Sequence, residues 1–219
     1  RGLRLDQLNG TGQADFFLTY VGCPPLHQIP PAAALKINCD IVEYCDRNVP
    51  NWVPISMAGY NGADSGLNAF QELGALFACN IAHLDEVRRR GTVPLEQLAT
   101  ALGGVSFRMG MDFFEDICKI RAARRMWPDI LSSRFGTPEE VAAITRFLCT
   151  EERTLRLRIH IVTAGSAMTY QEPINNVVRG TIMGLSAVLA GVQSMGVSAY
   201  DEALSVPSEQ DHQQSVRVQ

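Results

Sequence analysis

The spacing of apolar residues along the chain changes repeatedly between steps of three or four and short unbroken runs. The stepped spacing predicts helices, and it occurs in residues 32–45, 65–90, 113–127 and 175–189. Short apolar runs bounded by turn residues predict strands, and they occur in residues 53–58, 104–109, 155–162 and 192–197. Because the two kinds of segment alternate with short connections, the pattern predicts an α/β fold with a parallel sheet and right-handed crossovers.

The segment 113–127 (FFEDICKIRAARRMW) predicts an amphipathic helix. Glu115 lies four residues before Lys119, and arginines crowd the C-terminal half, an order that suits the helix dipole. Taken alone, this pattern is typical of a scaffold helix with a basic end. The apolar positions that share one face are Phe113, Phe114, Ile117, Ile120, Ala123 and Trp127.

Two further helix starts are predicted in the second half of the chain. Thr137, followed by a proline and with Glu140 three residues on, has the form of a capped helix start. That helix is predicted to reach about residue 150, and residues 200–204 are predicted to begin another. Beyond residue 205 the chain turns polar. We therefore divide it into residues 1–205, which carry the α/β pattern, and a polar segment 206–219 that begins the next helix or a linker.

The predicted strand ends carry small and polar residues, whereas the interior of an ordinary (β/α)₈ barrel is filled with Val, Ile and Leu. If these side chains point inward, they would line a hollow, wettable axis in which a substrate could lie. The alternative, that they are ordinary strand-end and loop residues, stays open on the pattern alone. The residues are Thr11, Gln13, Ser56, Ser106, Thr163, Gly165, Ser166, Gln193 and Ser194.

Composition narrows the functional classes. The 219 residues are 46% hydrophobic, carry a net charge of -4 and have scattered basic residues, which gives no footprint for nucleic acid. No run of 18 apolar residues or signal-peptide pattern occurs, so neither a membrane span nor secretion is expected. Six dispersed cysteines without a C-x-x-C pair favour reduced, mostly buried thiols in a cytoplasmic protein, rather than disulfides or a metal site.

Six sequence blocks, in order along the chain, resemble those of the methylmalonyl-CoA mutase family. The segment 113–127 resembles FxEIAKxRAxRRLW, and residues 49–60 (VPNWVPISMAGY) resemble VPRWNPISISGY. The other blocks are LNGTGQAD (8–15), TAGSAMT (163–169) with NNVVR (175–179), GVQS (191–194) and YDEAL (200–204). The resemblance implies a (β/α)₈ barrel, of which this chain would be roughly the C-terminal two-thirds. The CoA arm would lie along its axis, and adenosylcobalamin would cap one end.

The same resemblance implies roles for individual residues in a radical 1,2-rearrangement of an acyl-CoA. Tyr60, Asn61 and His160 fall at positions around the reacting centre. Asp64, which replaces a glutamate, and Glu202 with the adjacent Ala203 fall where the family contacts the adenosyl group. The implied substrate-binding residues are Thr11, Gln13, Cys23, Ser106, Val162, Gln193 and Ser194.

Four positions depart from the family pattern near the acyl group. Cys23 stands where methylmalonyl-CoA mutase has an arginine that grips the substrate carboxylate, and a thiol cannot form that bidentate ion pair. Asn61 and Gly196 replace histidines, and Val162 replaces a glutamine. A carboxylate left without a partner would cost several kcal/mol. We therefore expect a substrate other than methylmalonyl-CoA, with an uncharged or bulkier acyl group.

The chain contains no D-x-H-x-x-G motif, which supplies the lower cobalt ligand in the family. A cobalamin-binding domain or small subunit is therefore expected elsewhere, in a dimer or hetero-oligomer. Two other hypotheses stay open: a non-catalytic paralogue that pairs structurally with an active mutase chain, and a different hollow-barrel enzyme without cobalamin.

Overall fold

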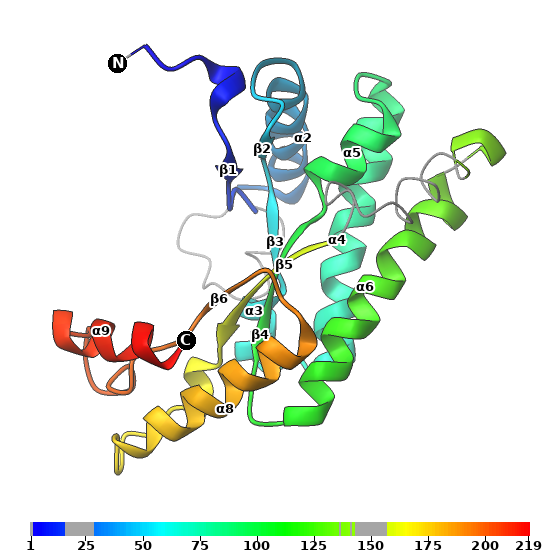
Figure 1. The fold of residues 1–219 in the computed structure, drawn as a ribbon. Helices are drawn as coiled ribbons and strands as arrows, with labels where there is room; N and C mark the ends of the chain where they lie inside the picture. The colour runs from blue at the N-terminus through cyan, green and yellow to red at the C-terminus, as the bar shows by residue number, and fades with distance from the viewer. Residues whose placement is uncertain (1, 16–28, 136, 141, 143–156) are drawn as a thin grey trace.

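The computed structural model describes residues 2–15, 29–135, 137–140, 142 and 157–219. Figure 1 shows the elements in chain order. The helices are η1 (Leu5–Gln7), α2 (Pro31–Asn48), α3 (Gly59–Asp64), α4 (Ala69–Arg90), α5 (Leu95–Ala101), α6 (Phe113–Phe135), η2 (Gly165–Ala167), α8 (Asn175–Ala190) and α9 (Glu209–Val218). The strands are β1 (Gly10–Thr11), β2 (Trp52–Val53), β3 (Ser56–Ala58), β4 (Gly104–Met109), β5 (Arg158–Thr163) and β6 (Ser194–Gly196).

The strands form two parallel sheets, one of four strands in the order β3-β4-β5-β6 and one made of β1 and β2. The predicted α/β class with parallel strands is therefore confirmed. Within the described ranges the strands do not close into a barrel, and the (β/α)₈ architecture stays a prediction. Closure requires a continuous ring of staggered strands, whereas these strands lie in two separate sheets.

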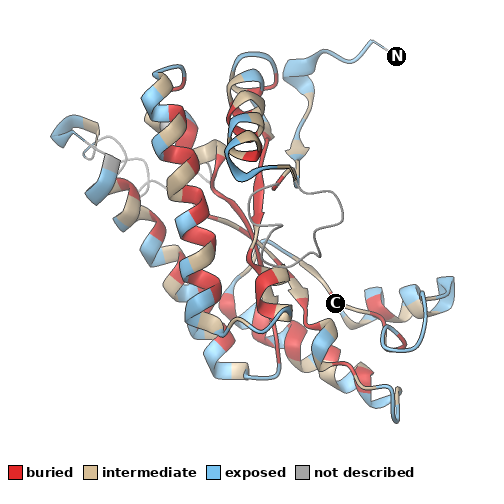
Figure 2. Ribbon diagram, turned by 180° about the vertical axis from the view of Figure 1, so that it is seen from behind, coloured by how far each residue is buried: buried red, intermediate tan, exposed pale blue. Residues whose placement is uncertain are grey.

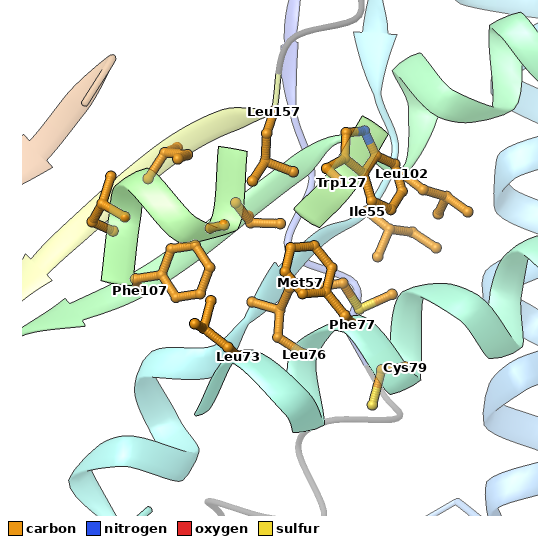
Figure 3. Packing of buried hydrophobic residues seen from close by; sticks show 14 of the residues in the cluster. Ile55, Met57, Leu73, Leu76, Phe77, Cys79, Leu102, Phe107, Trp127 and Leu157 are labelled. Atoms are coloured by element: carbon orange, nitrogen blue, oxygen red, sulfur yellow. The ribbon is translucent and has the colours of Figure 1, made fainter. Parts of the chain in front are cut away.

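The four-stranded sheet has one apolar face and one mixed face, as the side-chain alternation of β5 illustrates. Ile159 and Ile161 are fully buried in the main hydrophobic cluster, whereas Arg158, His160 and Val162 are only partly buried. Residues of α4, α6 and α8 complete that cluster, and Figure 2 shows their buried sides turned toward the sheet. In Figure 3, Phe77 and Trp127 lie close together; their rings stack with centroids 6.1 Å apart.

The predicted long helix 65–90 begins four residues later than expected. Asn68 caps α4: its side chain accepts from the backbone N–H of Gln71, and the Gln71 side chain accepts from the N–H of Asn68. The residues before this cap belong instead to the separate short helix α3, which starts directly after β3. Pro54 likewise separates the predicted strand 53–58 into β2 and β3.

The helix predicted for residues 113–127 extends to Phe135 and contains Pro128. Ile120, Ala123 and Trp127 are fully buried as expected, but Phe114 is 78% exposed, so its assignment to the apolar face was wrong. Cys118 in the same helix is also exposed, contrary to the expectation of a buried thiol. The step from Phe113 to Phe114 moves about 100° around a helix, so both cannot face the core.

The C-terminal part differs from the sequence pattern at one point. Residues 200–204 form turns rather than a helix start. The carbonyl of Asp201 accepts from the N–H groups of Leu204 and Ser205, and the chain then bends instead of continuing as a helix. The next helix is α9, capped by Ser208 and anchored where the Ser215 hydroxyl donates to the carbonyl of Val197.

The predicted start at Thr137 shows its capping box with Glu140, whereas the rest of the helix predicted to residue 150 lies mostly outside the described residues. The first residues of the predicted strand 155–162 lie outside them as well. No described helix has the length and apolar character needed to span a membrane.

Candidate functional site

The register of the sheet places several predicted site residues in one row. Ala58 pairs with Ser106, Ser106 with His160, and His160 with Ser194, so four neighbouring strands present these positions on the same face. The next row toward the C-terminal ends contains Arg108, Val162 and Gly196. In an open parallel sheet, ligands bind at the C-terminal ends of the strands. The second row lies near the C-terminal ends of β4, β5 and β6, and the first row lies two residues earlier on the same face. Together the two rows define a candidate site.

His160 lies at the centre of the first row. Its Nδ1 is hydrogen-bonded to the Ser194 hydroxyl at 2.8 Å, which fixes the plane of the ring. Burial lowers the pKa of His160 below its usual value, so the ring is neutral at neutral pH. A Cβ placed on Gly196 would lie 3.9 Å from Nε2, so the absence of a side chain there leaves space beside this nitrogen. A neutral imidazole can donate or accept a hydrogen bond at that position.

The other predicted substrate-binding residues are placed less uniformly. Ser106 is 2% exposed and belongs to the central row. Gln193 is exposed, and its Oε1 accepts from the N–H of Ile159 at 2.8 Å, so its carbonyl group caps the backbone of β5. Thr11 and Gln13 are exposed; Thr11 belongs to the two-stranded sheet, and Gln13 forms an isolated backbone bridge to Ile55.

The two remaining predicted substrate-binding residues are Cys23 and Val162. Cys23 lies outside the described residues, so its predicted place at the acyl group is not described. Val162, in the second row, is partly buried.

Helix α3, which starts directly after β3, carries Tyr60, Asn61 and Asp64, and all three are partly buried. Oδ1 of Asp64 accepts from Arg108 Nε at 2.9 Å and from the Ser166 hydroxyl at 2.8 Å. Arg108 Nη2 also donates to Ser166 at 3.3 Å. These contacts join α3, the end of β4 and the loop after β5 into one cluster.

Glu202 and Ala203 lie in the exposed turn after β6. A Cβ on Gly165 would be 3.4 Å from Oε1 of Glu202, so this carboxylate lies directly beside the loop that carries Ser166. Asp64 contacts Ser166 in the same loop. The two carboxylates predicted to contact the adenosyl group are therefore brought to one edge of the sheet, although 138 positions separate them (202 − 64).

Three charged residues from α4 and α6, next to the end of β4, were not assigned to the site from the sequence. Lys119 Nζ forms ion pairs with Glu72 at 2.9 Å and Asp116 at 2.7 Å, and the three side chains are at most 6% exposed. Lys119 also donates to the carbonyl of Arg108, and Glu72 accepts from the N–H of Arg108 at 2.9 Å. Burial raises the pKa of Glu72 above its usual value. This network fixes the end of β4, whereas the sequence showed only that Glu115 lies four residues before Lys119.

Asp15 is a fourth charged residue that sequence reasoning did not assign to the site. It is 5% exposed, and its Oδ2 accepts from the N–H of Ala58 at 3.1 Å, which ties the N-terminal segment to the end of β3. Its position two residues after the predicted Gln13 was the available signal.

The carboxylates of the candidate site are hydrogen-bond acceptors. Within the described residues no group of three His, Cys, Asp or Glu side chains could hold a metal. The carboxylates of Asp64 and Glu202 can accept hydrogen bonds from ribose hydroxyls, and both bonds recorded for Asp64 go to Oδ1 rather than Oδ2. Two acceptor carboxylates at one edge of the sheet would suit the hydroxyl groups of a ribose.

The described part of the chain is an α/β protein whose parallel sheet carries a row of polar side chains across neighbouring strands. A family model for methylmalonyl-CoA mutase matches residues 1–219, so the chain belongs to the methylmalonyl-CoA mutase family.

Individual relatives show about 30% identity. Methylmalonyl-CoA mutase of Escherichia coli is 32% identical over 209 residues, which are 95% of this chain and 27% of that protein. The 2-hydroxyisobutanoyl-CoA mutase large subunit of Aquincola tertiaricarbonis is 33% identical over 219 residues, which are 100% of this chain and 36% of that protein. The human mitochondrial methylmalonyl-CoA mutase is 30% identical over 208 residues, covering 95% and 26%. The chain thus spans about a quarter to a third of these relatives.

Proposed function

We propose that this chain is the substrate-binding part of an adenosylcobalamin-dependent acyl-CoA mutase. The observation that carries the proposal is the aligned row of Ser106, His160 and Ser194, with the carboxylates of Asp64 and Glu202 at its edge. Family membership over the whole chain supports the same function. The sheet β3-β4-β5-β6 would form part of a (β/α)₈ barrel completed by strands elsewhere, with the polar row facing its axis.

Each residue has a role that follows from its place. Adenosylcobalamin, when bound, supplies a carbon radical that removes a hydrogen atom from the acyl group. His160, held neutral by burial and oriented by Ser194, would hydrogen-bond the thioester carbonyl through Nε2. Ser106 and Gln193 would bind the amide and thioester groups of the CoA arm, since buried polar ligand groups need partners. Tyr60 would cover the reacting centre and exclude water.

The proposed substrate class is an acyl-CoA other than methylmalonyl-CoA. Val162 and Gly196, side by side in the second row, enlarge the space next to His160. Asn61 can donate a hydrogen bond but cannot act as an acid near neutral pH. Cys23 would add a small, weakly polar surface rather than a cation.

The assembly proposed is a hetero-oligomer with a cobalamin-binding small subunit, or a dimer with a fused cobalamin domain, in the cytoplasm. The relative from Aquincola is itself named as a large subunit. A non-catalytic paralogue is not favoured, because Asp64 in α3 and His160 in β5 retain polar partners, Ser166 and Ser194.

The test is product formation by the chain together with its cobalamin-binding partner and adenosylcobalamin. Isobutyryl-, 2-hydroxyisobutyryl-, pivalyl- and methylmalonyl-CoA are supplied separately, and rearranged acyl-CoA is measured by liquid chromatography and mass spectrometry. We expect rearrangement of at least one uncharged acyl-CoA, which His160→Ala reduces by about 10²-fold or more. Absence of any rearranged product in a complex that binds the cofactor would contradict the proposal.

A further inference from the structure

Arg108 is a charged residue at the site to which neither the sequence pattern nor the family resemblance assigns a role. It lies on the same face of β4 as Ser106, two residues closer to the C-terminal end. Arg108 pairs with Val162 in β5, and Val162 pairs with Gly196 in β6. At these two positions the side chain is smaller than the glutamine and histidine of the family pattern. A guanidinium next to space left by small side chains is placed to contact a ligand in addition to its side-chain partners.

The geometry of the guanidinium leaves donors available. Nε bonds to Asp64 and Nη2 bonds weakly to Ser166, while Nη1 has no hydrogen bond among the described residues. A Cβ on Gly110 would lie 3.2 Å from Nη1, so glycine at this position makes room for the group. The Arg108 side chain is 27% exposed and that of Asp64 23%, so a ligand could reach both side chains from solvent.

The charges around Arg108 favour a neutral ligand group over an anionic one. Asp64 balances the charge of Arg108 at 2.9 Å, and Glu202 lies beside the adjoining loop. A substrate carboxylate would meet two protein carboxylates and one guanidinium, and like charges at short range oppose binding. A hydroxyl or carbonyl oxygen would instead receive a hydrogen bond from a cation without a charge conflict.

The backbone of Arg108 is fixed independently of its side chain. Glu72 accepts from its N–H, and Lys119 donates to its carbonyl, both from the helix-covered side of the sheet. Substitution of the side chain leaves these backbone bonds available. The position of the guanidinium is therefore fixed by the end of β4 and by the bond to Asp64. A fixed donor is what a site needs to distinguish between similar acyl groups.

We infer that Arg108, with its charge neutralised by Asp64, is a specificity-determining residue that donates a hydrogen bond to an uncharged oxygen on the acyl group of the substrate. The inference rests on the proposed function and narrows its substrate class to hydroxyl-bearing acyl-CoA thioesters. The charge of Asp64 accordingly makes the site favour a neutral acyl group over an anionic one, in addition to the proposed contact of Asp64 with ribose.

The experiment measures equilibrium affinities of three matched ligands by titration calorimetry. Isobutyryl-CoA, 2-hydroxyisobutyryl-CoA and methylmalonyl-CoA present hydrogen, hydroxyl and carboxylate on similar skeletons. The full chain is used with its cobalamin-binding partner and hydroxocobalamin, which lacks the adenosyl group, so that no ligand is consumed. A hydrogen bond to a charged donor corresponds to a preference for the hydroxyl ligand over isobutyryl-CoA of about 10- to 100-fold.

The variants test the effect of the Arg108 side chain on ligand preference separately from effects on folding. Arg108→Met should reduce the hydroxyl preference to about threefold or less, and Gly110→Ala should weaken it by displacing the guanidinium. Asp64→Asn keeps an acceptor oxygen but removes the negative charge, and should shift relative affinity toward methylmalonyl-CoA by about tenfold. Arg158→Met is the matched control, because Arg158 lies on the same face of β5 at the opposite end of the sheet and should leave the preference unchanged.

The outcomes distinguish the inference from the proposed function. If wild-type protein binds all three thioesters equally, or if Arg108→Met keeps the hydroxyl preference, the inference is overturned while acyl-CoA binding stands. If neither CoA nor any thioester binds the wild-type complex, both fail. An unchanged charge preference in Asp64→Asn would also contradict the role given to the ion pair.

Discussion

Replacement of Lys119 by methionine tests whether the buried charges behind β4 hold the strand end in place. Methionine keeps most of the aliphatic length but removes the ammonium group. The change leaves the carboxylates of Glu72 and Asp116 almost fully buried without their cation. Breaking a buried pair by removing one partner costs about 3–5 kcal/mol. Each carboxylate keeps one backbone donor, from Arg108 and Gly110 respectively, which favours the lower half of that range.

The pH dependence of this loss has a defined sign. The pKa of Glu72 in the folded state is already raised by burial, and Lys119 opposes that rise. A carboxyl whose folded pKa is raised contributes stability below its unfolded pKa and loses it as pH rises through the folded pKa. Removing Lys119 raises the folded pKa further. The variant should therefore lose more stability relative to wild type at pH 8 than at pH 5.

The assay is urea unfolding of the purified chain at both pH values, followed by far-ultraviolet circular dichroism of its helices. We expect a lower midpoint with an unchanged m-value at each pH. The control is Lys36→Met, because Lys36 and its partner Asp40 are 69% and 45% exposed and such pairs contribute little. A loss below 1 kcal/mol that is the same at pH 5 and pH 8 would refute the buried network.

Three other predictions concern the core, the site histidine and the thiols. Trp127→Ala removes a fully buried ring stacked on Phe77 and should destabilise the chain by about 3–5 kcal/mol in the same urea assay; a loss under 1 kcal/mol would mean that the core is loosely packed. Because burial lowers the pKa of His160, its contribution to stability should fall as pH drops below the unfolded value of 6.5, and His160→Gln should reduce that acid sensitivity in pH-dependent melting. Brief iodoacetamide treatment with mass mapping should label exposed Cys118 before Cys39 and Cys79, whose buried thiols have pKa values raised to about 12; equal labelling would contradict their burial.

Local signals in the sequence predicted most of the regular elements. Strand β4 and helix α8 begin where the apolar pattern placed them, because β4 is a nearly continuous buried run and the buried residues of α8 recur at steps of three or four. The start of α4 was placed too early, although Asn68 and Gln71 form a recognisable capping box. The turn at residues 200–204 depends on bonds to one carbonyl, which apolar spacing does not reveal.

The spacing of apolar residues could not predict contacts between residues that are far apart in the sequence. Lys119 lies four residues after Glu115, yet one of its partners, Glu72, comes from another helix 47 positions earlier. The bond between Asp64 and Ser166 joins residues 102 positions apart. The resemblance to the family pointed to Asp64 and Glu202 individually, but only the fold shows that they flank the same loop and that Arg108 lies beside one of them.

The most direct test of the central claim is cobalt–carbon homolysis in the assembled protein. The chain, its cobalamin-binding partner and adenosylcobalamin are mixed with an acyl-CoA, and the cofactor is followed by ultraviolet–visible and electron paramagnetic resonance spectroscopy. We predict that a hydroxyl-bearing acyl-CoA produces the cob(II)alamin spectrum, that CoA alone does not, and that Glu202→Ala weakens cofactor binding. A complex that binds both cofactor and acyl-CoA but shows no homolysis with any thioester would contradict the account.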